Sequence, residues 1–120
     1  MDRKYEVIFC IVNSGFSEVV MDAARKAGAR GGTVFHGRGT GRREAEELFK
    51  IQIQPEKELV MILVPAEIKD KVLNGLYIEA GLDSAGHGIA FSLPVERTLG
   101  LGDTEQINGK KAAPSAEEDA

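Results

Sequence analysis

The order of two kinds of hydrophobic periodicity along the chain constrains its fold most strongly. Runs of β-branched and aromatic residues, or strict alternation of apolar and polar residues, predict strands. Apolar residues that recur every three or four positions predict amphipathic helices. The order is strand, helix, strand, strand, helix, strand. The expected elements are Tyr5–Val12, Phe16–Ala27, Gly31–His36, Leu48–Gln54 continuing through a turn or bulge at Pro55–Lys57 into Leu59–Val64, Pro65–Ala80, and Ile89–Val95.

The two expected helices carry recognisable start and stop signals. In the first, Ser17 is the expected N-cap and Gly28 the expected C-terminal stop, with acidic residues early and basic residues late, as the helix dipole favours. Pro65 stands at the entry of the second helix. The expected core stripes are Phe16, Val19, Val20, Ala23, Ala24 and Ala27 in the first helix, and Ile68, Val72, Leu76 and Ala80 in the second.

This order of elements predicts an α+β, ferredoxin-like βαββαβ fold: a four-stranded antiparallel sheet with both helices on one face. Because the runs Tyr5–Val12 and Leu59–Val64 are apolar on both sides, the uncovered face of the sheet should be apolar too. An exposed apolar sheet face predicts oligomerisation. We expect one folded domain over residues 1–102 and a disordered acidic tail over residues 103–120, whose apolar content is too low for a core.

Composition argues against several classes of function. No apolar run reaches the ~18 residues of a membrane span, and the N-terminus leads at once into a strand, so neither membrane insertion nor a signal peptide is expected. The net charge of −4 argues against nucleic-acid binding. The single cysteine, Cys10, permits no internal disulfide and is expected to be a core thiol. Together these features favour a cytoplasmic protein.

The segment Thr33–Arg43, TVFHGRGTGRR, is the principal candidate for a binding site. Its three alternating glycines allow close approach of the backbone to a ligand, and their N–H groups beside arginines can cradle an anion. Gly81–Gly88 is a second glycine-rich loop, in which His87 can donate to an anion or serve only the turn. The alternative for the first segment is a loop whose glycines only turn the chain and whose arginines are balanced by nearby glutamates.

Metal binding and catalysis find little support in the sequence. His36 and His87 are the only histidines, and no histidine–cysteine spacing typical of a metal site is present. His36 is expected to be exposed on its strand or to lie at a subunit contact. No serine stands in a nucleophile elbow, and the alternating glycines lack the helix and acidic residue of a dinucleotide fingerprint. We therefore expect neither a metal ion nor a catalytic residue.

Three local features resemble the PII signal-transduction family. The run Gly31-x-Thr33-Val34 into Gly39-Thr40-Gly41-Arg42 is similar to the family's strand and the glycine-x-glycine-arginine entry to its T-loop. Gly86-His87-Gly88 stands where the family has the glycine-aspartate-glycine of its B-loop. Pro94-Val95-Glu96 follows the last strand, as the same tripeptide does in the family. The resemblance covers Tyr5 to about Leu101.

The resemblance implies a homotrimer that binds adenine nucleotides (ATP, ADP or AMP) in clefts between neighbouring subunits. It implies that a T-loop, about residues 38–49, docks on a target enzyme or membrane transporter. It also implies that a B-loop, about residues 81–88, offers backbone groups to the phosphates, with Arg42 facing them. The residues implied to bind the ligand are Thr33, Gly39, Thr40, Gly41, Arg42, Gly86, His87 and Gly88.

The chain departs from the family pattern at several cationic positions. The family's B-loop lysine is Ile89 here, and its two arginines after the proline–valine–glutamate fall by count at Gly100 and Gly102. Each is normally a charge-assisted phosphate contact, worth roughly 1.5–3 kcal/mol. The T-loop is shorter and lacks the tyrosine that receives uridylyl groups, and Arg43 replaces the glutamine that helps to hold 2-oxoglutarate and magnesium. A nucleotide, a smaller anion and no ligand at all therefore stay open.

We accordingly expect a PII-like regulator in nitrogen or carbon metabolism, whose loop changes its order when a small anionic effector binds. The alternative is a small ferredoxin-like enzyme that uses Arg42 and His87 on a phosphorylated or carboxylated metabolite. A third possibility is a structural trimer without a ligand.

Overall fold

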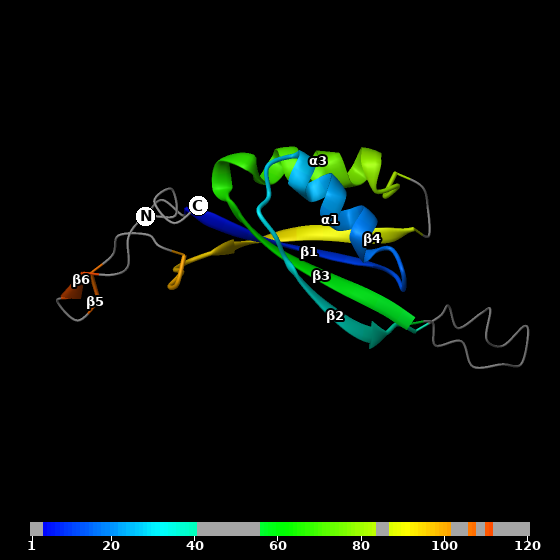
Figure 1. The fold of residues 1–120 in the computed structure, drawn as a ribbon, viewed down its shortest axis with the longest axis horizontal. Helices are drawn as coiled ribbons and strands as arrows, with labels where there is room; N and C mark the ends of the chain where they lie inside the picture. Colours follow the sequence, from blue (N-terminus) through cyan, green and yellow to red (C-terminus); the bar gives the residue numbers. More distant parts are fainter. Residues whose placement is uncertain (1–3, 41–55, 84–86, 102–105, 108–109, 112–120) are drawn as a thin grey trace, which may run out of the picture.

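The computed structural model describes residues 4–40, 56–83, 87–101, 106–107 and 110–111 (Figure 1). Its elements in chain order are β1 (Tyr5–Asn13), α1 (Ser17–Lys26), β2 (Thr33–Arg38), β3 (Glu56–Pro65), the short 3₁₀ helix η1 (Ala66–Ile68), α3 (Lys69–Glu79) and β4 (Gly88–Val95). Two further short strands, β5 (Gln106–Ile107) and β6 (Lys110–Lys111), pair with each other.

The main sheet has the strand order β2-β3-β1-β4, and each neighbouring pair is antiparallel. Figure 1 shows α1 and α3 together on one face of this sheet, which leaves the opposite face without a helix. The predicted ferredoxin-like βαββαβ arrangement is therefore confirmed.

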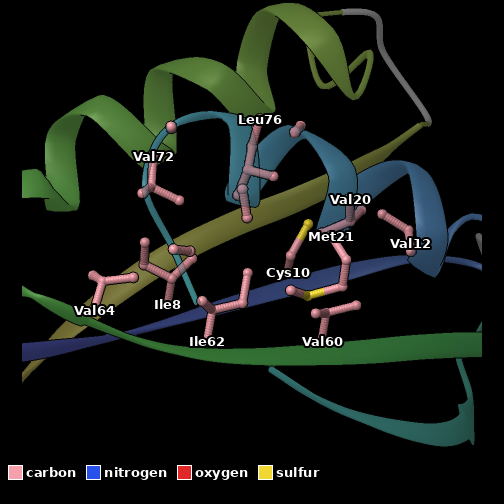
Figure 2. Packing of buried hydrophobic residues seen from close by; sticks show 14 residues of the cluster. Ile8, Cys10, Val12, Val20, Met21, Val60, Ile62, Val64, Val72 and Leu76 are labelled. Carbon is pink, nitrogen blue, oxygen red and sulfur yellow. The ribbon is translucent and has the colours of Figure 1, made fainter. Parts of the chain in front are cut away.

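Side chains alternate strictly between the two faces of the sheet. Within β1, Ile8, Cys10 and Val12 are buried towards the helices, because successive strand residues point to opposite faces. Ile8 lies opposite Ile62, and Cys10 opposite Val60, so buried residues meet across the β1–β3 ladder. Figure 2 shows these side chains packed beneath the two helices.

The helices contribute a narrow set of residues to this core. In α3, Val72 and Leu76 are fully buried, and Ile68 and Ala80 pack against the core from either side, as the predicted stripe requires. In α1 the buried residues are Val20, Met21, Ala23 and Ala24, followed by Ala27. The predicted stripe is wrong at Phe16 and Val19, which are 53% and 42% exposed. Met21 is buried instead, so the buried face of the helix is rotated relative to the predicted one.

The predicted N-cap of α1 is also wrong. Phe16 occupies the N-cap position, Ser17 is the first helical residue, and no side chain of the cap residue makes a hydrogen bond. Glu58 of β3 replaces the local cap: its Oε1 accepts hydrogen bonds from the backbone N–H groups of Gly15 at 2.9 Å and Ser17 at 3.1 Å. The C-terminal stop is confirmed, since Gly28 follows the C-cap residue Ala27 with a φ of +113°.

The strand boundaries differ from the sequence prediction around the glycine-rich segment. β2 runs from Thr33 to Arg38, two residues later than expected at each end. The turn or bulge predicted at Pro55–Lys57 is wrong where the structure describes it, because Glu56 and Lys57 already belong to β3 and pair with Arg38 and Gly37. The strand predicted at Leu48–Gln54 lies outside the described residues.

The predicted second helix divides into η1 and α3, with Pro65 at its entry. In the predicted disordered tail the structure describes only the β5–β6 pairing, so disorder of residues 103–120 stays a prediction. Within the described ranges, no helix is long and apolar enough to cross a membrane.

Candidate functional site

The two predicted glycine-bearing bends lie at the same end of the sheet but at opposite edges. Antiparallel pairing places the last residues of β1 and β2 beside the first residues of β3 and β4. Gly39 and Thr40 follow β2, whereas His87 and Gly88 lead into β4. Because β2 and β4 are the edge strands, the bends are three strand spacings apart, about 14 Å. One subunit therefore does not bring them together.

A lysine that the sequence prediction missed lies against the first of these bends. A Cβ atom added at Gly39 would lie 3.0 Å from Cε of Lys57, so the backbone and the lysine stem are in direct contact. The Lys57 ammonium donates to Oδ1 of Asn13 at 2.6 Å. Lys57 was expected in a turn, but the β2–β3 register, which sets Gly37 opposite Lys57, carries it to the base of the glycine-rich segment.

Side chains of both charges surround the start of the glycine-rich segment, where β2 ends and β3 begins. A cavity of about 400 Å³ is lined by His36, Gly37, Arg38, Glu56 and Lys57. His36 is exposed in the single chain, which is compatible with both expected positions, on the surface or at a subunit contact. Its Nδ1 lies 3.5 Å from Oε2 of the buried Glu58. This end of the β2–β3 hairpin thus carries cationic side chains together with carboxylates that balance them.

Glu58 is held in its charged form. Its partial burial would raise the pKa of the carboxyl group, but the N–H groups of Gly15 and Ser17, the Ser17 hydroxyl and nearby His36 together lower that pKa below its ordinary value. A charged carboxylate at the start of α1 also suits the positive end of the helix dipole. Glu58 therefore couples the strand at the base of the glycine-rich segment to α1.

The second bend is organised by its own hydrogen bond and by a close strand contact. Nδ1 of His87 lies 3.1 Å from the carbonyl oxygen of Gly81. Because a carbonyl can only accept, this contact requires the proton on Nδ1 and leaves Nε2 for other partners. Gly88 has a φ of +151°, and a Cβ atom there would lie 2.6 Å from the Ile11 oxygen. Packing against β1 thus already requires glycine at this position.

Thr33 lies apart from both bends. It begins β2, about 17 Å along the strand from Arg38. There it lines a cavity of about 480 Å³ with a largely apolar wall. Other lining residues include Tyr5, Arg30, Met61, Leu63 and Leu101.

The predicted site residues therefore fall into three groups. Thr33 lines the cavity at one end of the sheet, whereas Gly39, Thr40, His87 and Gly88 occupy the two edges at the other end. Gly41, Arg42 and Gly86 lie outside the described residues.

Cys10 and the possible metal ligands of the described residues were the remaining candidates for reactive chemistry. Cys10 is fully buried in β1, and burial raises the pKa of its thiol to about 11, so the core-thiol prediction is confirmed. Among the residues that the structure describes, no group of three or more histidine, cysteine, aspartate and glutamate side chains converges in a way that could hold a metal ion.

Comparison with known proteins agrees with the fold. The family model described as nitrogen regulatory protein P-II matches residues 6–104. The comparison with curated proteins gives no match. Among the solved structures with a similar fold are the following two, each at less than 25% sequence identity.

The first is CPII, a nitrogen regulatory PII-like protein from Thiomonas intermedia K12, bound to ADP, AMP and bicarbonate. It is 19% identical with a TM-score of 0.56, over 79% of this chain and 96% of that one. The second is Arabidopsis thaliana PII bound to citrate, 24% identical with a TM-score of 0.61, over 94% of this chain and 93% of that one. Because the family model spans most of the sequence, including both glycine-rich bends, the chain belongs to the nitrogen regulatory protein P-II family.

Proposed function

We propose that this protein is a homotrimeric regulator that binds a small anionic effector, an adenine nucleotide in the first instance, between neighbouring subunits. Its segment at about residues 38–49 would report the bound state to a partner enzyme or transporter in nitrogen or carbon metabolism. The observation that carries this proposal is the separation of the two glycine-bearing bends onto opposite edges of one sheet. A site that uses both bends requires a second copy of the chain.

The open face of the sheet supports assembly. In β4, Ile89, Phe91 and Leu93 are 58%, 42% and 49% exposed. The register sets them beside Ile11, Phe9 and Val7 of β1, and the Phe9 and Phe91 rings lie 5.5 Å apart between centroids. Leu59, Met61 and Leu63 of β3 continue the same surface on the other side of β1. A contiguous apolar face of this kind favours burial against copies of the same chain.

The described residues also support an anionic ligand with an apolar part. Lys57 beside Gly39 provides a cation at one bend, and the proposed contribution of Arg42 would add a second. The cavity at Thr33 offers apolar walls suited to a ring. The ligands named for the two similar structures, ADP, AMP and bicarbonate in one and citrate in the other, are all small anions.

A thermal-shift screen followed by calorimetry tests this proposal. The ligands are ATP, ADP, AMP, cyclic AMP, bicarbonate and 2-oxoglutarate, and each is also assayed for turnover. We expect at least one to raise the melting temperature without being consumed, since a ligand that binds only the folded state stabilises it. Turnover would support the enzyme alternative, and no shift with any ligand would support the structural trimer.

The variant Arg42→Ala tests the glycine-rich segment itself. We expect it to abolish binding of the ligand found in the screen, because the phosphate or carboxylate loses a charge-assisted hydrogen bond. Arg25→Ala is the matched control, since Arg25 lies on the exposed side of α1 and pairs only loosely with Asp22, at 3.9 Å. Unchanged affinity in Arg42→Ala would exclude Arg42 from the site.

A further inference from the structure

The cavity that begins at Thr33 carries one charge in an otherwise neutral lining. Among the described residues that line it, Arg30 is the only charged one. Its larger apolar and aromatic lining residues are Tyr5, Met61, Leu63 and Leu101. At about 480 Å³ the cavity is within the usual range for small-molecule sites, which combine apolar walls with a few placed polar groups.

The backbone that carries Arg30 is held from both sides. Before it, Ala29 is buried and its N–H donates to the Ala24 oxygen at 3.0 Å, which ties the segment to the end of α1. After it, Gly32 presses against β3, because a Cβ atom there would lie 2.8 Å from the Met61 oxygen. Arg30 therefore leaves a fixed backbone at the cavity, so little backbone order is lost when it meets a ligand.

We propose that Arg30 is a specificity-determining residue of this cavity: it pairs with an anionic group attached directly to the bound ring compound, as in a nucleoside monophosphate. This inference rests on the proposed function and adds a third cation, at the other end of the sheet from Lys57. A guanidinium binds phosphate or carboxylate through two parallel hydrogen bonds, which a neutral analogue does not form. The apolar walls contribute equally to the charged and the neutral form of the ring.

The preference for AMP over adenosine and the preference between ATP and AMP should depend on Arg30 differently. Arg30 sets the preference for the charged ring compound over its neutral form, for example AMP over adenosine. Further phosphates would extend beyond the group that Arg30 holds, so the ratio of ATP to AMP affinity should not depend on Arg30.

Calorimetry with adenosine, AMP and ATP on the full chain tests these ratios. In Arg30→Gln we expect AMP affinity to fall about ten- to a hundredfold while adenosine affinity changes less than twofold, as the loss of a charged hydrogen bond predicts. Arg30→Lys should recover part of the AMP affinity. Arg25→Gln, which removes the same charge from the exposed side of α1, should leave all three affinities unchanged.

A purely structural role is the competing explanation, since Arg30 also has an interaction within the chain. Such a role would lower the melting temperature of the unliganded variant and weaken AMP and adenosine alike. Either that result, or equal affinity of the natural protein for AMP and adenosine, would overturn the role of Arg30 while leaving the proposed function intact.

The remaining outcomes concern the site as a whole. Leu63→Ala should weaken AMP and adenosine together, because it removes part of the apolar wall that both forms share. If bicarbonate binds and no nucleoside or nucleotide does, the role of Arg30 is overturned but anion sensing is retained. If none of the six screened ligands binds, both proposals fail.

Discussion

Glu58 is a buried carboxylate that caps the start of α1. This role usually belongs to a residue beside the helix in the sequence. Its Oε1 accepts from two backbone N–H groups that precede or begin α1, and its Oε2 lies near His36. These donors come from a segment more than forty positions away along the chain. The start of α1 is therefore secured only once β3 is in place.

We expect Glu58→Gln to lower the free energy of unfolding at neutral pH by about 1 kcal/mol, because a neutral amide accepts these hydrogen bonds less strongly than a carboxylate. The pKa of Glu58 is lowered in the folded state, so its contribution is present above its ordinary value of 4.5 and is lost as the pH falls through the lower folded-state pKa. Urea denaturation of the natural protein and of Glu58→Gln, at pH 7 and at acidic pH, measures the difference in the free energy of unfolding.

The difference in the free energy of unfolding between the natural protein and Glu58→Gln should therefore decrease as the pH falls. Glu96→Gln, at an exposed carboxylate, should match the natural protein at pH 7. A Glu58→Gln difference that persists unchanged at a pH where all carboxyl groups are protonated would contradict this account.

Ser17 illustrates why single residues are harder to predict than elements. A serine followed by glutamate and an apolar run is a plausible local cap, and local pattern is all that a sequence window contains. The actual partner depends on the register between strands. Lys57 was missed for the same reason, because only the pairing of Gly37 with Lys57 places it beside Gly39.

At the scale of elements, β4 begins with a glycine that close packing against β1 requires. Gly88 combines a positive φ with a contact that leaves no space for a side chain, whereas Gly37 of β2 has no atom within 4 Å of an added Cβ. The same residue type thus has two physical meanings within the candidate site. At Gly88 it permits close strand packing, and at Gly37 it leaves room near the surface.

The pair Gly88→Ala and Gly37→Ala measures this difference. Gly88→Ala should lower the free energy of unfolding by about 1–3 kcal/mol through overpacking, with further backbone strain. Gly37→Ala should leave it unchanged or raise it by up to about 1 kcal/mol, because alanine restricts the unfolded chain. Chemical denaturation compares the two, and equal losses would show that the contact at Gly88 is not limiting.

Element order was predictable because periodicity is a local property that burial imposes on strands and helices alike. The boundaries of the elements were harder to predict. Pro55 suggested a turn, yet β3 is already formed at Glu56. The apolar face of α1 was misjudged at Phe16 and Val19, because packing of Met21 against the sheet, which no local pattern specifies, decides the rotation of the helix.

At the scale of the whole molecule, the two faces of the sheet differ in what covers them. One is covered by α1 and α3, and the other exposes a continuous apolar surface along β4, β1 and β3. The candidate site was predicted only as residue types, glycines and cations, because the proposed site would be completed only where copies of the chain meet. The glycine chemistry was readable from the sequence, whereas the cavity at Thr33 needed the three-dimensional fold.

We expect sedimentation of the natural protein at three times the 12.9 kDa of one chain. Phe91→Glu should shift it to the mass of a single chain, because assembly would bury an unpaired charge. Ile78→Glu is the matched control on the helical layer, where Ile78 is 60% exposed, and should leave the mass unchanged. A circular dichroism spectrum establishes that both variants are folded, and a Phe91→Glu protein of unchanged mass would rule out the open face as the interface.

The placement of β2 and β4 at opposite edges has a consequence for mixtures of variants. If each site takes one bend from each of two copies, a chain disabled at Gly39 and another disabled at Gly88 can complement one another in hybrid assemblies, where the intact halves meet. Dilution below the dissociation threshold of the assembly would then release the effector, and a saturating effector would in turn hold the subunits together.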